Sequence, residues 1–103
     1  MTPQDLIRII EEDLAHAADS LVWHGRPLKS CLQVPRRIRV LNSHNNDEAE
    51  ELWFVFEEGP NPGEGYKVVY DEDVNMFGLA VNGIKEPVLI GLYGGFMETL
   101  NSM

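Results

Sequence analysis

Residues 52–56 constrain the fold of this chain more than any other stretch. The run Leu-Trp-Phe-Val-Phe is apolar at every position and has acidic pairs on both sides, Glu50-Glu51 before it and Glu57-Glu58 after it. Successive side chains of a β-strand point to opposite faces, so a strand here must be covered on both faces. The run is too short for a buried helix, and all but the leucine are aromatic or β-branched. We therefore predict a central strand, with the rest of the chain as its cover.

The chain has the size of one small domain. With 103 residues, 44% of them hydrophobic and 24% charged, it can bury a core without disulfides or a metal. Cys31 is its one cysteine, so no disulfide can form within the chain and a reducing compartment is expected. The N-terminus shows no basic segment followed by a long apolar run, and no stretch is long and apolar enough to span a bilayer. We expect a single domain over residues 1–103, a cytoplasmic location and no membrane partner.

Negative charge is concentrated in the second part of the chain. The formal net charge is −9. Residues 1–41 are nearly balanced, whereas residues 42–103 hold twelve acidic residues against two lysines. Such a field repels phosphate backbones and attracts basic partners, so no nucleic-acid partner is expected. We expect Arg36, Arg37 and Arg39 to neutralise neighbouring carboxylates instead.

A helix is expected at the start of the chain. Thr2, Pro3 and Asp5 are typical of a helix start: a hydroxyl cap, a proline in the first turn, and an acid near the positive end of the helix dipole. Apolar residues then recur every third or fourth position, which predicts a face that packs on a sheet. Gly25 predicts the end of the helix, which is therefore expected to reach about Trp23.

Three residues lie beside the apolar face of this predicted helix. Ile9, His16 and Trp23 recur every seven positions and would form a second line along it. One interpretation is that they cover the edge of the core, with His16 exposed. The other is that they form a contact surface for a second copy of the chain or for another partner.

The remaining sequence alternates between strand and turn patterns. Alternating apolar residues predict a strand from about Cys31 to Asn42, in which Pro35 indicates an edge or a bulge. Further strands are expected at residues 66–70 and 76–81, and a last strand from Pro87 to the Gly94-Gly95 pair. These glycines are expected to let the chain turn tightly from that strand into a short helix at residues 96–103. The predicted fold is α+β: an antiparallel four- to five-stranded meander sheet packed on one long N-terminal helix, with a short C-terminal helix.

A second copy of the chain is an expected partner. Residues 52–56 and 88–90 are apolar on both faces, while one long and one short helix are available to cover them. One face of the sheet would then lack cover within a monomer. We expect a homodimer through that face or through Ile9, His16 and Trp23.

The sequence contains no complete catalytic, metal or cofactor motif. Asp71, Asp73 and Asn75 match the first half of a calcium loop, but the glycine and the bidentate glutamate of its second half are missing. An acidic hairpin turn is the better interpretation. The histidines and Cys31 show no zinc-ligand spacing, and no nucleophile lies in a known motif. We expect no metal and no cofactor.

The favoured function is a non-catalytic protein-binding module that docks its acidic half on a basic partner. Charge would set the rate of encounter, and aromatic side chains would act as anchors. In size, charge and element pattern the chain resembles, at class level, the small acidic α+β immunity and inhibitor proteins of bacteria, which implies such a role. The expected partner surface comprises Ile9, His16, Trp23, Trp53, Tyr66, Tyr70, Asp71, Glu72 and Asp73.

The alternative function is a small hydrolase or isomerase. Its acid and base would be a carboxylate pair in a sheet cleft, with Glu57 or Glu58 beside Asp71 or Asp73. His44, in an expected loop, is a second candidate for the catalytic acid or base. No nucleophile, base and orienting group stand at a recognisable spacing, so the binding function is preferred.

Overall fold

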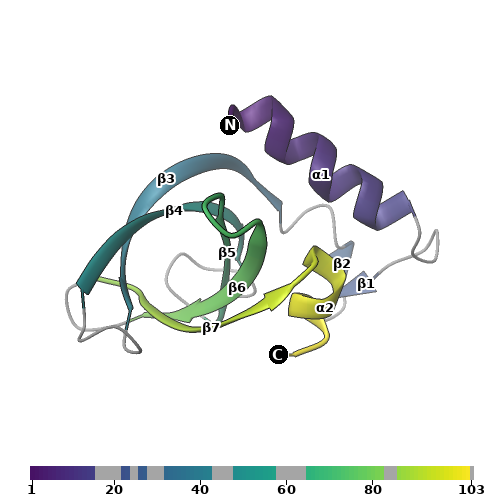
Figure 1. Ribbon diagram of the computed structural model, residues 1–103. Coiled ribbons are helices and arrows are strands. Elements are labelled where there is room, and N and C mark those ends of the chain that lie inside the picture. Colours follow the sequence, from purple (N-terminus) through teal and green to yellow (C-terminus); the bar gives the residue numbers. More distant parts are fainter. Residues whose placement is uncertain are drawn as a thin grey trace.

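Five strands in meander order form the body of the protein and close into a barrel (Figure 1). The computed structural model describes residues 1–15, 32–42, 48–57, 65–82 and 86–102, and the backbone of residues 22–23 and 26–27. The barrel strands are β3 (Leu32–Asn42), β4 (Glu48–Glu57), β5 (Lys67–Asp71), β6 (Met76–Val81) and β7 (Val88–Gly94). Two helices accompany them, α1 (Pro3–Ala15) and α2 (Phe96–Leu100). The predicted α+β class, the antiparallel meander and the short C-terminal helix are confirmed, and the sheet has five of the predicted four to five strands.

Barrel closure is the feature that the sequence did not reveal. Consecutive strands pair antiparallel, and β3 then pairs in parallel with β7 at Leu41–Val88 and Asn42–Leu89. Register shifts interrupt three of the antiparallel pairs, β3–β4, β4–β5 and β6–β7. Such bulges bend strands and increase their twist, which lets a small sheet curl onto itself. The shift in β3 falls between Leu32 and Arg36, where Pro35 predicted a bulge.

The predicted central strand lies in β4 and is buried on both faces. Every residue from Leu52 to Phe56 is at most 7% exposed. Leu52 belongs to one apolar cluster and Trp53 to another on the opposite face, as the two-residue period of a strand requires. The strand is thus the element that both clusters share.

The smaller cluster lines the interior of the barrel. It takes one buried residue from each of the five strands: Val40, Leu52, Val69, Ala80 and Leu89. The adjacent positions Arg39, Glu51 and Ile90, which face the other way, are exposed. The second face of the sheet is therefore covered within one chain. Self-association stays a prediction, because Ile90 on the outer face is 37% exposed and keeps part of the lack of cover that motivated it.

The larger cluster joins the outer face of the strands to the two helices. It combines Leu6 and Ile10 of α1 and Phe96 and Leu100 of α2 with buried side chains of β4, β5 and β6. The Phe96 ring meets Phe56 edge-on with centroids 6.0 Å apart, and Phe77 with centroids 5.5 Å apart. The helices thus form a layer on one outer side of the barrel (Figure 1).

The predicted helix start is confirmed in its hydrogen bonds. The Thr2 backbone N–H donates to Asp5 Oδ2 at 3.0 Å, and the Asp5 N–H donates to Thr2 Oγ1 at 3.2 Å. This reciprocal pair satisfies donors that a helix end leaves without partners. The pKa of Asp5 is lowered below its ordinary value, chiefly by the hydrogen bond with the Thr2 backbone and next by the one with the Thr2 side chain.

The predicted helix end is wrong. α1 ends at Ala15, and β1 (Val22–Trp23) pairs antiparallel with β2 (Arg26–Pro27). Valine and tryptophan favour extended backbone, and the glycine that indicated a helix end is equally typical of hairpin turns. Because Ile9 and Trp23 belong to different elements, their separation by two seven-residue intervals does not align them on one helix. His16 lies outside the described residues.

Candidate functional site

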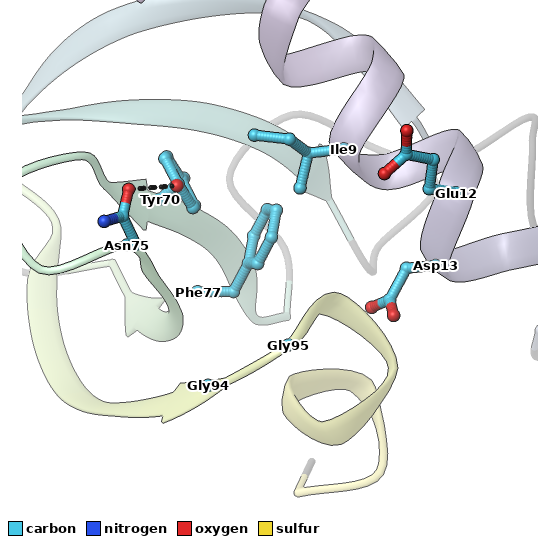
Figure 2. Close-up of a pocket in the computed structure, with 8 residues that line it drawn as sticks. All are labelled: Ile9, Glu12, Asp13, Tyr70, Asn75, Phe77, Gly94 and Gly95. Carbon is cyan, nitrogen blue, oxygen red and sulfur yellow. Dashed lines mark hydrogen bonds between the residues drawn. The ribbon is translucent and has the colours of Figure 1, made fainter.

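A pocket of about 440 Å³ lies where α1, the β5–β6 hairpin and the start of α2 meet (Figure 2). This volume falls within the roughly 300–1,000 Å³ typical of ligand sites. The pocket is lined by Ile9, Glu12, Asp13, Tyr70, Asn75, Phe77, Gly94 and Gly95. Three segments far apart in the sequence therefore contribute to a single site.

The β5–β6 hairpin supplies the aromatic side of the pocket. Tyr70 and Phe77 are paired across the hairpin, and their ring centroids lie 4.6 Å apart. The Tyr70 hydroxyl donates to Asn75 Oδ1 at 3.0 Å (Figure 2). Burial, followed by the charges of Glu72 and Asp71, raises the pKa of Tyr70. Its hydroxyl therefore keeps its proton, and with it this hydrogen bond, at neutral pH.

The turn of this hairpin is held by its own side chains. Asp71 Oδ1 accepts a hydrogen bond from the Asp73 backbone N–H at 3.0 Å, which forms an Asx turn. Asn75 has a φ of 54°, in the left-handed region that asparagine tolerates. The calcium-like spacing is thus accounted for by a turn. Within the described ranges, no group of three His, Cys, Asp or Glu residues could hold a metal ion.

Helix α1 supplies the acidic side of the pocket, with Glu12 and Asp13 in its last turn. Asp13 Oδ2 accepts a hydrogen bond from the Met97 backbone N–H at 3.0 Å. Gly95, the N-cap residue of α2, has no side chain to make such a bond, so Asp13 provides this acceptor from the other helix. The contact ties the two helices together at the pocket.

The third side is the Gly94-Gly95 turn between β7 and α2. Gly94 has a φ of 110°, which other residues rarely adopt. A Cβ atom on Gly95 would lie 3.3 Å from Asp13 Oδ2, so glycine leaves room for the carboxylate. The expectation that these glycines serve a tight strand-to-helix turn is confirmed.

The aromatic residues of the expected partner surface lie mostly in the core. Trp53 is 7% exposed and Tyr70 3% exposed, so they offer a partner little area. Tyr66 is half-buried and packs on the larger cluster, and so does Ile9, which also lines the pocket. The side chain of Trp23 lies outside the described residues.

The arginines of β3 contact carboxylates, as expected. Arg37 pairs with Glu72 and lies 3.9 Å from Glu51, and Arg39 pairs with Glu86 at 2.8 Å. Glu72, in the expected partner surface, is therefore partly neutralised within the chain. The Arg36 guanidinium lies over the Phe54 ring at 5.1 Å, and no carboxylate among the described residues forms an ion pair with it.

Among the described carboxylates of the expected enzymatic pair, Glu57 does not approach Asp71. Glu57 accepts a hydrogen bond from Lys67 Nζ at 2.9 Å, and Lys67 is the first residue of β5. Asp71 ends the same strand, roughly 13 Å away at about 3.3 Å per residue. Glu58 and His44 lie outside the described residues.

The site residues that the sequence failed to indicate are Glu12 and Asp13. Neither residue is part of a local motif, and the contact of Asp13 with Met97 spans 84 residues. Lining residues Ile9 and Tyr70 both belong to the expected partner surface, but the sequence did not indicate that they share a pocket. Only the Gly94-Gly95 pair gave a local signal, the expected end of a strand before a helix.

Comparisons with known proteins give no further indication of function. No protein-family model, curated protein or solved structure matches this chain. Within the part of the chain that the structure describes, no helix has the length and apolar character needed to cross a membrane. The function must therefore be argued from the site itself.

Proposed function

We propose that this protein is a cytoplasmic, non-catalytic module that binds a basic protein partner at the pocket between α1 and the β5–β6 hairpin. The observation that carries the proposal is a pair of carboxylates, Glu12 and Asp13, at the edge of a pocket that also presents Ile9 and Phe77. Acidic groups beside apolar surface suit a basic side chain with an apolar stem. An immunity- or inhibitor-like role is one form of such binding.

The distribution of ion pairs supports this location. Arg37, Arg39 and Lys67 are engaged by carboxylates elsewhere on the barrel. Among the described residues, no ion pair involves Glu12 or Asp13. Within this same described part of the chain, Glu72 of the Asp71–Asp73 turn is thus paired with Arg37, whereas the two pocket acids have no cationic partner. We therefore place the proposed docking site at the pocket and not at the Asp71–Asp73 turn.

The geometry argues against the enzymatic alternative. The described members of the expected carboxylate pair, Glu57 and Asp71, are separated along β5, and Asp13 is occupied as the acceptor for Met97. The raised pKa of Tyr70 keeps its hydroxyl neutral and unsuited to act as a base. Binding is the function that the lining groups support best.

Affinity capture from the source cell tests the proposal. The immobilised protein is expected to retain proteins of basic composition at low salt and to release them as salt rises. Screening shortens the reach of a charge from about 30 Å at 0.01 M ionic strength to about 3 Å at 1 M. Identification of the retained proteins at both salt concentrations is the measurement. A retained set without basic proteins, or one that high salt leaves unchanged, would contradict the proposal.

A further inference from the structure

The side chains that line the pocket offer many hydrogen-bond acceptors and few donors. Glu12 and Asp13 contribute carboxylate oxygens, although one oxygen of Asp13 already accepts from Met97. The Tyr70 hydroxyl donates to Asn75, which leaves its oxygen able to accept. The amide of Asn75 is the one lining side chain that carries N–H groups. A ligand rich in donors and without acceptors is complementary to such a set, and a guanidinium group has five N–H donors and no acceptor.

The last turn of α1 adds to the negative potential. It carries Glu12 and Asp13 and no basic residue. The C-terminal end of a helix favours cations, so acids in this turn are placed against the helix dipole. Sequence choices that oppose a local rule are expected where function requires them. A cation bound in the pocket would relieve this unfavourable arrangement.

The apolar part of the pocket fits the rest of an arginine side chain. Figure 2 shows Ile9 extending from α1 toward Phe77, with the carboxylates of Glu12 and Asp13 on the helix side of both. A planar guanidinium stacks on aromatic rings and binds carboxylates through two parallel hydrogen bonds. The methylene stem of arginine packs against apolar groups such as Ile9. Lysine carries a strongly hydrated point charge, so it has neither a planar group to stack on a ring nor paired donors for a carboxylate.

We propose that this pocket is a subsite for an arginine side chain of the basic partner. The inference rests on the proposed function, since it names the group that the partner inserts. Glu12 provides the accessible carboxylate, Asp13 the second charge, and Ile9 and Phe77 the apolar contact.

Titration of the isotopically labelled full chain with N-acetyl-arginine amide tests the subsite by NMR. The arginine probe is expected to shift the backbone amides of Gly94 and Gly95 and the side-chain amide of Asn75 in a saturable way. N-acetyl-citrulline amide, a neutral analogue of similar shape, is expected to shift none of them. N-acetyl-lysine amide is expected to bind more weakly than the arginine probe.

Two matched variants then assign the contact. Glu12→Gln is expected to weaken arginine binding by up to about fivefold, the range for one exposed ion pair. Glu11→Gln makes the same charge change on the neighbouring, exposed residue, which does not line the pocket, and is expected to leave the affinity within about twofold. Equal losses in the two variants would overturn the assignment to Glu12.

The outcomes separate this inference from the proposed function. Equal binding of the citrulline or lysine probe, or no shifts at Gly94 and Gly95, would overturn the arginine subsite even if a basic partner is captured. Absence of any basic partner in the capture experiment would remove the proposed function. Arginine-specific shifts that Glu12→Gln weakens would support the subsite in either case.

Discussion

Replacement of Phe56 by alanine is expected to lower the free energy of unfolding by about 3–5 kcal/mol, the range for removing a buried aromatic ring. Phe56 is fully buried in the larger cluster and meets Phe96 edge-on, so it joins the central strand to α2. Its loss would leave a cavity between sheet and helix that the rigid barrel cannot close completely. Since small domains are stable by only about 5–15 kcal/mol, this one change removes a large share of the total.

Urea unfolding followed by circular dichroism measures the effect. Val34→Ala is the matched control, because Val34 is an apolar strand residue that is 78% exposed. The control is expected to change the free energy of unfolding by no more than about 0.5 kcal/mol. A loss below about 1 kcal/mol for Phe56→Ala would mean that α2 does not pack on β4 as described.

The Gly78→Ala substitution is expected to destabilise the barrel by about 1–3 kcal/mol through overpacking. A Cβ atom on Gly78 would lie 2.4 Å from the Gly91 carbonyl oxygen and 2.8 Å from Leu92 Cδ2, so β6 and β7 would have to separate. Where space permits, the same type of change stabilises a protein by about 0.4–1 kcal/mol, because alanine restricts the unfolded chain. The sign of the measured change therefore reports on the distance between these strands.

Gly91→Ala is the control for this prediction. The three atoms nearest to its Cβ atom would all belong to the Tyr93 side chain, the nearest at 3.4 Å, which is ordinary contact. Thermal unfolding of the two variants is expected to show a lower midpoint for Gly78→Ala and little change for Gly91→Ala. The opposite order would contradict the described pairing of β6 with β7.

Strand positions were predictable because they depend on local patterns. The unbroken apolar run at residues 52–56 and the turn residues between the later strands were sufficient to place the meander. Closure was not predictable, because it depends on bulges and on the parallel contact of Leu41 with Val88, which are far apart in sequence. The helix end was missed because Gly25 is compatible with two different structures.

The candidate site was less accessible to sequence reasoning than the fold. Its walls come from residues 9–13, 70–77 and 94–95, and no periodicity relates them. Trp53 and Tyr70 were interpreted as anchors because aromatic residues are enriched at interfaces, but in a small barrel the same residues complete the core. The charge excess in residues 42–103 predicted docking by that part of the chain, whereas the acids that line the pocket, Glu12 and Asp13, belong to α1.

Paired charge reversals on α1 test the central claim most directly, namely that a basic partner docks at the pocket. The measurement is the Kd of a fluorescent arginine-rich peptide at about 0.1 M ionic strength, where screening limits the reach of a charge to about 10 Å. Glu12→Lys is expected to raise Kd roughly tenfold or more, because it replaces an exposed attraction of up to about 1 kcal/mol by a repulsion of similar size. Glu11→Lys, which carries the same change in net charge, is expected to raise Kd by no more than about threefold. Equal effects of the two reversals, or no effect of either, would contradict docking at this pocket.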